Sequence, residues 1–568
     1  MAVKRISAAA FKHSGLSTAR RRFAKAEDGA VLVFSLVLFI LMIMMGGVAV
    51  DLMRYETTRT TLQNTLDRST LASASLSQGL DPETVVRDYF SKAGMSQFLK
   101  TVTVTNGLNF RNVEAHALAD AEPFFLHMIG INTFEAPAAS VAEQRINNVE
   151  IALVLDVSGS MAGTKLTNLK SAASEFVSTV LASDGDDRIS IGIVPYNGQV
   201  NLGPLMAAKF NVTLPTGVAN TACVDLPASV YTATDMSRTL ALPTTAYADT
   251  FSSTTLSTSF VSVASAGTPN AGNRWCPPST VNVVRPPINV VSTLQSNINA
   301  MTAVGATSTN AGLKWGLTLL DPASRPIFAE FANAGTILPS FGVRPFDYTD
   351  KEAMKVIILM TDGDHFAEER VNTPYKSGAS KIFRASDGNY SINHDTVTRP
   401  TAAGTKTFFV PHLCTSTGCK NGSNTAEAWS ATKYSNGVEL SWQEVWTNMR
   451  VSYVAWQLYE RALGKDSNRN SVYNTWMANF RTLTPTATMD DQMQAICTLA
   501  KTKQNIVIYG IAFDAPANGQ LQIKKCTSGY NPAKPNDDNP FYFVSTPTNI
   551  KTAFRAIATN ISQLRLTQ

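Results

Sequence analysis

Several residue patterns that mark enzymes are missing from this chain of 568 residues. It has six histidines, and none of them belongs to a metal-type pair. It contains neither a Gly-x-Ser-x-Gly segment, which carries the serine nucleophile of many hydrolases, nor a Cys-x-x-Cys segment, which indicates zinc. The stretch from Gly159 to Lys165 does not fit a phosphate-binding loop, because only three residues separate its glycines and Thr164 precedes the lysine. These absences argue against an enzyme.

The formal net charge of the chain is confined to its first 28 residues. The chain holds 48 Lys and Arg against 43 Asp and Glu, and residues 1–28 contribute seven basic and two acidic residues, so the remainder is balanced at 41 of each sign. The basic tail lacks the interleaved aromatic residues and the folded module of a nucleic-acid-binding segment. We interpret it as a signal for membrane topology.

A run without any charged residue follows, from Val31 to Val50. As a helix its twenty residues would measure about 30 Å, enough to cross a bilayer. A cleaved signal peptide is the alternative, but its apolar region is shorter and ends at a small-residue cleavage site. Here Asp51 begins a polar stretch that keeps helical character to about Ser77. Three leucines of this stretch are expected on one helical stripe: Leu62, Leu66 and Leu71.

We therefore predict a retained transmembrane helix over 29–51. The excess of Lys and Arg before it places the tail, residues 1–28, in the cytoplasm and everything after residue 50 outside.

All six cysteines lie in the part of the chain predicted to be outside, where an even number suits disulfides. Six cysteines permit fifteen pairings. Cys414 and Cys419 bracket a short loop that a bridge would close. Cys497 and Cys526 flank an apolar segment at 506–513. Cys223 and Cys276 lie within one long polar segment. Reduced structural thiols are the alternative, and zinc is disfavoured because His412 is the only histidine near a pair.

The most informative stretch begins with the apolar run Ile151 to Leu155, which has the length and composition of a buried parallel strand. Asp156, Ser158 and Ser160 follow at alternate positions, and a helix is predicted over 166–181. One carboxylate and two hydroxyls on a loop after a strand can converge as hard oxygen ligands for a divalent cation. The same residues are also ordinary in turns and at helix starts.

Two further segments favour the metal. A second apolar strand, Val356 to Met360, ends in Thr361-Asp362-Gly363, and between the two strands Gly305-Ala306-Thr307-Ser308-Thr309 precedes a helix over 310–320. In this order the three segments resemble the metal-ion-dependent adhesion site of von Willebrand factor A (vWA) domains. The resemblance implies these metal ligands: Asp156, Ser158, Ser160 and Thr307, with Asp362 binding directly or through water. Thr309 is the alternative to Thr307.

The chemistry of these side chains agrees with that assignment. All of them offer oxygen, and none offers the nitrogen or sulfur that favours zinc or copper. Mg²⁺ is the expected ion, with Mn²⁺ and Ca²⁺ left open. Two carboxylates, of which Asp362 binds directly or through water, do not over-neutralise a divalent ion, so an open coordination position could accept a carboxylate from a partner protein, which is how the vWA family uses it.

The fold class implied by the resemblance is α/β. We expect a Rossmann-like, doubly wound and mostly parallel vWA sheet, which includes strands at 189–196 and 506–513 and ends with a strand at 541–544 and a helix at 550–564. The predicted parts of the chain are a basic tail (1–28), a transmembrane helix (29–51), a helical stalk with a small α+β region (52–148), and a vWA domain (149–568) with inserts at about 197–290 and 363–500. The second insert contains a predicted helix from Glu439 to Leu463, whose aromatic stripe is expected in the core.

The small α+β region shows strand patterns at 102–105, 113–119 and 134–141 and a short helical piece at 124–128. The whole arrangement resembles the TadG proteins of tight-adherence (Flp-type) pilus systems. The matching N-terminal pattern is Glu27-Asp28-Gly29-Ala30, the apolar run, Asp51-Leu52, and Leu62 to Asp67. One departure is Phe34, where related pseudopilins carry Glu at the fifth position after the cleaved glycine, which argues against processing at Gly29.

The resemblance implies a bacterial inner-membrane protein with a single membrane pass, a cytoplasmic N-terminus and a periplasmic bulk. Its expected function is metal-dependent protein binding, of the adhesion type, in the assembly or anchoring of a pilus. The expected partners are other pilus-assembly or envelope proteins that offer an acidic side chain, with no nucleic acid. The alternatives are a mainly structural pseudopilin-like protein with a structural metal, and a metal-dependent hydrolase. Asp364 and His365 follow the metal loop but are interpreted as loop residues.

Overall fold

The computed structural model divides into two compact units, Met1–Arg145 and Ile146–Gln568, which we call the N-terminal unit and the C-terminal unit. The structure describes residues 20–21, 29–75, 78–106, 110–121, 123–145, 148–182, 184, 187–214, 218–250, 274–350, 352–414, 426–465, 467–503 and 505–562.

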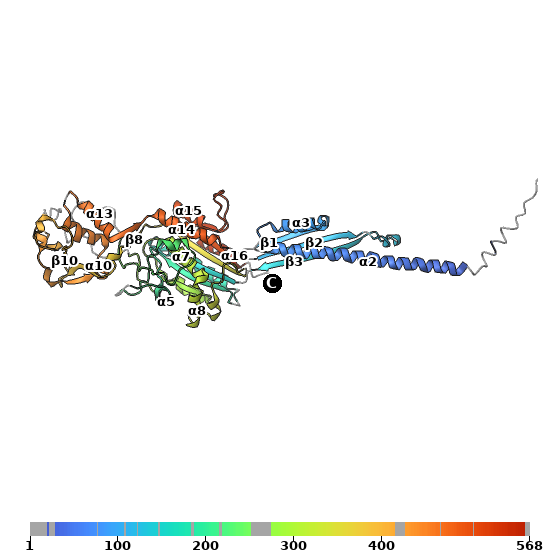
Figure 1. Cartoon of the computed structure of the whole chain (residues 1–568), viewed down its shortest axis with the longest axis horizontal. Coiled ribbons are helices and arrows are strands. Elements are labelled where there is room, and N and C mark those ends of the chain that lie inside the picture. The colour runs from blue at the N-terminus through green and yellow to red at the C-terminus, as the bar shows by residue number, and fades with distance from the viewer. Residues whose placement is uncertain are drawn as a thin grey trace, which may run out of the picture. The chain divides into compact units, whose positions relative to one another are not determined.

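The N-terminal unit consists of a long helix, a short helix and a three-stranded antiparallel sheet in the order β1-β2-β3 (Figure 1). Its elements are α2 (Ala30–Ala74), α3 (Pro82–Lys92), η2 (Ser96–Phe98), β1 (Leu99–Asn106), β2 (Phe110–Ala121), η3 (Leu126–Ile129) and β3 (Phe134–Arg145). Asp81 caps the start of α3 by accepting a hydrogen bond from the backbone N–H of Thr84 at 2.9 Å. The three predicted strands lie within β1, β2 and β3.

Helix α2 packs on the sheet through small side chains. Side chains alternate between the two faces of a strand, so every second residue of β2 and β3 points toward the helix. The buried residues at these positions are mostly alanine: Val113, Ala115, Ala117 and Ala119 on β2, and Ala136 and Ala138 on β3. Leu62 and Leu66 of α2 are fully buried against them. Short side chains on the sheet let the helix come close.

The predicted stripe of three leucines is wrong at Leu71, which is 68% exposed. Nine residues separate it from Leu62, and at about 100° per residue it lies on the opposite side of the helix. Thr70 and Ser73 are buried in that region instead. Their hydroxyls donate to carbonyl oxygens of the preceding turn, and Thr70 Oγ1 also lies 2.9 Å from Ser140 Oγ of β3.

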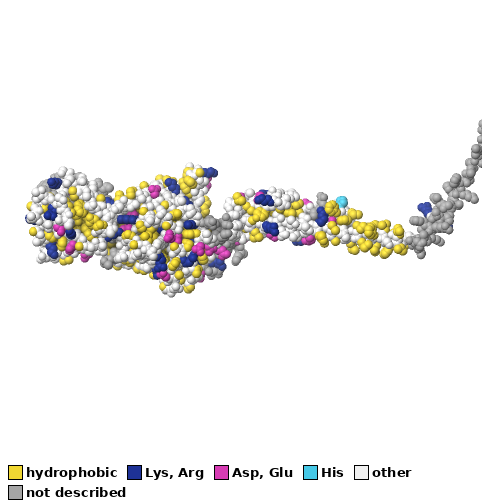
Figure 2. All heavy atoms as spheres, in the orientation of Figure 1, with side chains coloured by type: hydrophobic (Ala, Val, Ile, Leu, Met, Phe, Trp, Pro, Cys, Tyr) yellow, Lys and Arg dark blue, Asp and Glu magenta, His cyan; other side chains and the backbone are white. Residues whose placement is uncertain are grey.

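The N-terminal part of α2 is long and apolar enough to cross a membrane. It is the one helix among the described residues that meets this criterion, with a mean hydropathy of 2.8 over its most apolar window, of which 6% is buried. Figure 2 shows hydrophobic side chains covering this part of the helix. An anchor and a signal sequence both have this character.

The C-terminal unit is built on a six-stranded mixed sheet in the order β16-β15-β7-β4-β5-β6. Its strands are β4 (Asn148–Asp156), β5 (Ile189–Tyr196), β6 (Arg285–Ile288), β7 (Ala353–Thr361), β15 (Ile506–Phe513) and β16 (Tyr542–Ser545). Neighbouring strands are parallel except β5 and β6, which are antiparallel. The central strands are buried on both faces, which explains their continuous apolar sequences.

Helices cover this sheet and form the main core with it. They are α4 (Thr164–Leu181), α5 (Gly203–Ala207), α6 (Val291–Ala300), α7 (Thr309–Leu320), α8 (Arg325–Asn333), α14 (Thr486–Lys501), α15 (Ala517–Cys526) and α16 (Ile550–Ser562). Helix α7 packs on β4 so closely that a Cβ at Gly316 would lie 2.4 Å from Val154 Cγ2, and α14 packs on α7. Helix α4 packs against α6 and α16, where the rings of Phe176 and Phe554 lie 5.9 Å apart.

Three of these elements come from segments predicted to be inserts, and one of them is helix α5, which lies within 197–290. Edge strand β6 lies within 197–290, and core helix α14 begins within 363–500.

The rest of the second predicted insert (363–500) forms its own layer around an aromatic cluster. The ribbon of β8 (Glu368–Val371) and β14 (Arg481–Thr484) brackets it, and its five-stranded sheet has the order β12-β11-β10-β9-β13. The elements are β9 (Ala379–Arg384), β10 (Tyr390–Asn393), β11 (Phe408–Phe409), β12 (Trp429–Ser430), β13 (Val438–Ser441), α10 (Trp442–Asn448), α11 (Val451–Tyr453), η13 (Val454–Glu460), α12 (Arg461–Leu463) and α13 (Arg469–Phe480). Trp442 and Trp446 stack at 5.0 Å and are buried, as expected for a core stripe.

The predicted single helix from Glu439 to Leu463 is wrong in two places. Glu439 lies in β13, and the first helix begins only after Ser441, which forms a capping box with Glu444. This helix ends at Asn448, and the backbone of the next residue, Met449, is extended at φ −135° and ψ 141°. A second helical segment then runs over 451–463.

Among the described residues of the C-terminal unit, disulfides join Cys223 with Cys276 and Cys497 with Cys526. The second connects α14 to α15 across the edge of the core. The suggested pairing of Cys414 with Cys419 lies outside the described residues, because Cys419 is not among them.

Replacing Cys497 and Cys526 together by alanine is expected to lower the free energy of unfolding by about 3–4 kcal/mol. The bridge joins residues 29 apart in sequence, and without it the unfolded chain gains the corresponding loop entropy. Urea unfolding of the oxidised protein, followed by circular dichroism, measures the change. An unchanged unfolding midpoint would contradict the prediction.

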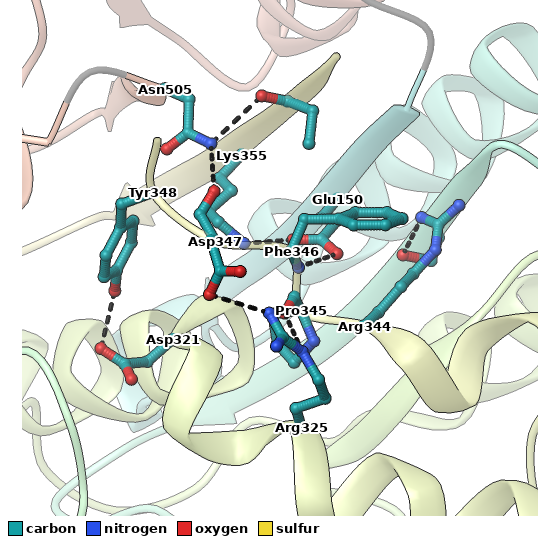
Figure 3. A network of polar contacts seen from close by, with 12 residues as sticks. Glu150, Asp321, Arg325, Arg344, Pro345, Phe346, Asp347, Tyr348, Lys355 and Asn505 are labelled. Atoms are coloured by element: carbon teal, nitrogen blue, oxygen red, sulfur yellow. Dashed lines mark hydrogen bonds and ion pairs between the residues drawn. The ribbon is translucent and has the colours of Figure 1, made fainter. Parts of the chain in front are cut away.

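A buried polar network lies near the amino-terminal ends of β4 and β7 (Figure 3). Lys355 of β7 forms an ion pair with Glu150 of β4, its neighbour in register. Glu150 also accepts a hydrogen bond from the backbone N–H of Phe346 at 3.0 Å. Arg344 is buried and donates to the carbonyl oxygens of Val149 and Arg188, which ties the starts of β4 and β5 together. The opposite ends of these strands carry the predicted metal ligands.

Candidate metal centre

The predicted ligands gather where two neighbouring strands end. β4 ends at Asp156 and β7 ends at Thr361, followed at once by Asp362. The two strands are parallel partners in the sheet, so their carboxyl ends meet at the same edge. Both carboxylates are buried there, with Asp156 at 0% and Asp362 at 3% exposure.

Four of the five predicted ligands are joined by hydrogen bonds. The backbone N–H of Ser158 donates to Asp156 Oδ1 at 2.8 Å. Ser158 Oγ lies 2.9 Å from Ser160 Oγ, and Ser160 Oγ donates to Asp362 Oδ1 at 2.7 Å. Because the Ser160 proton goes to the carboxylate, the Ser158 hydroxyl is the donor between the two serines. Lone pairs of both hydroxyl oxygens therefore remain available to a cation.

Thr307 lies on a neighbouring loop. Gly305 accepts a hydrogen bond from the backbone N–H of Gly159 at 2.9 Å, which brings this loop against the turn that carries the two serines. Gly305 has φ +85°, a conformation that favours glycine. Thr307 is buried, and its carbonyl accepts from the N–H of Phe366. Among the described residues, no hydrogen bond joins its hydroxyl to the other four predicted ligands.

The alternative threonine, Thr309, begins helix α7. Its hydroxyl oxygen lies 3.4 Å from that of Tyr196, whose single proton is donated to the carbonyl of Met360 at 2.8 Å.

Three residues at this edge do not belong to the predicted ligand set: Thr361, Lys165 and Asp514. Thr361 Oγ1 donates to Asp156 Oδ2 at 2.8 Å. Lys165 Nζ lies 2.9 Å from Asp362 Oδ2 and 3.3 Å from Asp514 Oδ2. Asp514 follows the last residue of β15, so its position after an apolar strand was a usable signal. Lys165 belongs to α4, and only the packing of that helix brings it to the site.

Burial and charge act together on this cluster. Burial raises the pKa of the Asp156 carboxyl to about 6, and the nearby charge of Asp362 adds to the rise, against hydrogen bonds from Ser158 and Thr361. Partial burial alone would lower the pKa of Lys165, but hydrogen bonds to Asp362 and Asp514 outweigh it and raise the pKa. A buried carboxylate with a raised pKa is one that a bound cation would stabilise.

The donor set fits a hard divalent cation. The cluster offers two carboxylates and two serine hydroxyls, with Thr307 beside it. No group of three or more His, Cys, Asp or Glu side chains with metal-site geometry occurs in the described part of the chain. A zinc or copper centre made of such side chains therefore has no support there, whereas Mg²⁺ binds through one or two carboxylates and keeps several waters.

His365 follows Asp362 by three residues in the chain, and both of its ring nitrogens are engaged. Its Nε2 accepts from the backbone N–H of Asn310 at 3.1 Å, so Nδ1 carries the proton and donates to Asp490 at 2.6 Å. This histidine joins α7 to α14 and has no free nitrogen to act as a general base. The pocket that it lines, with Thr361 and Asp364, has an empty volume of about 200 Å³, below the usual size of a small-molecule site.

Comparison with known families gives one match. Residues 29–76 match the family described as "Putative Flp pilus-assembly TadE/G-like". The TadG-like character predicted from the sequence is confirmed for this segment, and the match supports a role related to pilus assembly. A search of curated proteins gives no match.

Several solved structures of pilus proteins align with this chain at low sequence identity and low TM-score. The von Willebrand factor domain of the type V pili tip protein Mfa5 from Porphyromonas gingivalis has 13% identity and a TM-score of 0.28, over 73% of this chain and 95% of that one. The PilB minor pilin from Streptococcus sanguinis has 11% identity and a TM-score of 0.30, over 82% of this chain and 78% of that one. The pilus adhesin SpaC from Lactobacillus rhamnosus GG has 10% identity and a TM-score of 0.26, over 82% and 33%. At these TM-scores none of the three supports an argument about this protein.

Proposed function

Taking residues 29–76 as a TadE/G-like segment, we propose that this protein is a membrane-anchored binding protein of a tight-adherence (Flp-type) pilus system. The apolar part of α2 is its anchor, the basic tail is cytoplasmic, and the C-terminal unit faces the periplasm. The C-terminal unit binds a partner protein through a divalent cation. The observation that carries this binding mode is the chain of hydrogen bonds from Asp156 through Ser158 and Ser160 to Asp362.

We assign the C-terminal unit to the doubly wound vWA fold. Support comes from the order of its parallel strands, with the buried strands β4 and β7 at the centre and helices packed against them. In such sheets ligands bind outside the carboxyl ends of the strands, where this oxygen cluster lies. The residues that would hold the ion are the predicted set: Asp156, Ser158, Ser160, Thr307 and Asp362.

The charge of the cluster favours an acidic partner. Lys165 forms an ion pair with Asp362, so part of the negative charge of the two buried carboxylates is already compensated. The cluster with a bound divalent ion would therefore carry net positive charge. When bound, the ion supplies an electrophilic centre that attracts a carboxylate, while the surrounding residues hold and orient it. Mg²⁺ is the proposed ion.

Two alternatives are less well supported. In a purely structural role the ion would steady the turn after β4 and would contact no partner. A hydrolase would require a general base beside the ion, and the engagement of both nitrogens of His365 speaks against that residue.

We expect chelation to release the partner. Full-length protein would be captured from detergent-solubilised envelopes of pilus-forming cells, and the bound proteins compared in Mg²⁺ and in excess chelator. The Asp156→Asn variant should capture no partner in Mg²⁺. Asp538→Asn removes the same charge from an exposed position away from the cluster and should behave as the wild type. A partner that stays bound in chelator and to Asp156→Asn alike would show that the metal is not in the interface.

A further inference from the structure

The connection between β2 and β3 exposes large apolar side chains. We call residues 123–131 the hairpin tip. Phe124 is 69% exposed, Met128 is 74% exposed, and Phe125 and Ile131 are each more than a third exposed. These residues follow one another on a short segment of the N-terminal unit, so they form a local apolar surface rather than scattered exceptions.

The hairpin tip is fixed to one place on α2. The Phe125 ring packs on Gly47, where a Cβ would come within 2.4 Å of the ring. The Asp51 carboxylate accepts hydrogen bonds from three consecutive backbone N–H groups of the tip, those of Phe124, Phe125 and Leu126, at 2.7–2.9 Å. The guanidinium of Arg54 lies over the Phe124 ring at 4.1 Å. The tip is therefore held between Gly47 and Arg54.

This stretch of α2 is the end of its apolar run. The run ends at Val50, and Gly47 lies three residues earlier, about 4.5 Å along the helix axis. If the run crosses the bilayer, as the proposed function holds, Phe125 lies at the depth of the last apolar turn. Neighbouring exposed side chains of the tip then lie at the boundary between the hydrocarbon and the head groups.

The backbone chemistry of the tip suits that depth. Backbone N–H groups without partners are strongly disfavoured in a lipid environment, and Asp51 satisfies three of them. Phenylalanine and methionine provide apolar surface, and an arginine beside them can keep its charged head among the head groups. The Asp51 carboxylate therefore lies just after the apolar run of α2 and holds the hairpin tip in place beside it.

We propose that the hairpin tip inserts into the outer interface of the membrane that holds α2, as a second lipid contact. This inference rests on the proposed anchoring of α2. The occupant of the apolar surface is the bilayer, because the tip continues the apolar surface of the same helix. The contact would fix the three-stranded sheet at a constant height above the membrane.

Depth-dependent fluorescence quenching tests the proposal. The full-length protein carries a single environment-sensitive label at Met128→Cys and is reconstituted into vesicles that contain nitroxide-labelled lipids. Two further label positions calibrate it: Leu38→Cys within the apolar run, and Leu71→Cys, which is exposed on the same helix beyond it. Wild-type protein, labelled in parallel, gives the background from native cysteines.

We expect the label at Met128 to be quenched by nitroxide near the head groups several-fold more strongly than the label at Leu71. Strong quenching at Leu38 with none at Met128 would overturn this inference alone. No quenching at Leu38 would overturn the anchor and this inference with it. A Met128 label that neither lipid nitroxide nor aqueous iodide can quench would show that a protein covers the tip.

A matched pair of glycine variants gives a second readout. Gly47→Leu places a side chain into the Phe125 ring, whereas a Cβ at Gly46 meets nothing within 4 Å. Gly47→Leu should reduce lipid quenching at Met128 several-fold and leave quenching at Leu38 unchanged, and Gly46→Leu should alter neither. Equal quenching at Met128 in both variants would show that lipid contact does not depend on the packed tip, and would overturn the proposal.

Discussion

Replacing Asp156 by asparagine is expected to abolish divalent-cation binding while the C-terminal unit stays folded. Asparagine has the shape of aspartate, and its carbonyl oxygen can still accept the Ser158 N–H that Asp156 Oδ1 accepts. Its amide can donate to Thr361 Oγ1, whose own proton can turn to the carbonyl of Gly363, 3.3 Å away. Only the buried negative charge is lost, and a hard cation depends on that charge.

Isothermal titration calorimetry with Mg²⁺ and Mn²⁺ would measure this loss. Asp538→Asn is the control, since it removes an exposed carboxylate. Equal cation affinity in the wild type and in Asp156→Asn would refute the site.

The same variant should respond differently to pH when the metal is removed. The pKa of Asp156 is about 6 in the folded protein against an ordinary value of 3.8, so between these pH values the unfolded state has already released its proton while the folded state keeps it. Stability due to this residue therefore falls as pH rises through that range, by about 3 kcal/mol. In chelator at pH 7, Asp156→Asn should be at least as stable as the wild type, and Mg²⁺ should stabilise only the wild type.

Thermal unfolding in chelator and in Mg²⁺, at pH 4.5 and pH 7, measures both effects. A wild type that is more stable than Asp156→Asn in chelator at pH 7 would show that the buried charge is compensated without a metal.

The sequence was sufficient to bring most of the candidate site together, for a simple physical reason. Asp156 and Asp362 each follow an uninterrupted apolar run, and such runs form central parallel strands whose carboxyl ends share one edge. Ser158 and Ser160 then follow from local spacing. The position of Lys165 could not be predicted, because it depends on how α4 packs and on the reach of a long side chain.

The errors in the fold have equally local causes. Edge strand β6 contains Pro286 and Pro287. Proline is uncommon in strands, so the sequence pattern did not predict a strand here, although an edge strand tolerates proline. The break at Met449 is invisible to periodicity, since Trp446 and Met449 are both buried and the apolar pattern continues through the break. Leu71 matches the other two leucines in residue type but not in angular position, since nine residues at about 100° each place it opposite Leu62.

Replacing Lys355 by methionine is expected to destabilise the C-terminal unit by about 3–5 kcal/mol, since it leaves a buried charge without its partner. The Lys355 side chain is 0% and the Glu150 side chain 3% exposed, and the two are adjacent on the central strands. Burial lowers the pKa of Lys355, even though the negative charge of Glu150 acts to raise it. A charge left without its partner at this buried site would therefore be strongly unfavourable.

The double variant Glu150→Gln with Lys355→Met should recover much of that loss. Glutamine can still accept the Phe346 N–H, and no uncompensated charge remains. A surface control is Lys551→Met, which removes a pair with Glu175 at 4.0 Å between side chains that are 45% and 33% exposed, and it should change stability by at most about 1 kcal/mol. Urea unfolding of the four proteins compares these changes. If Lys355→Met unfolds at the same urea concentration as Lys551→Met, water or a neighbouring group compensates Glu150, and the ion pair does not hold the central strands together.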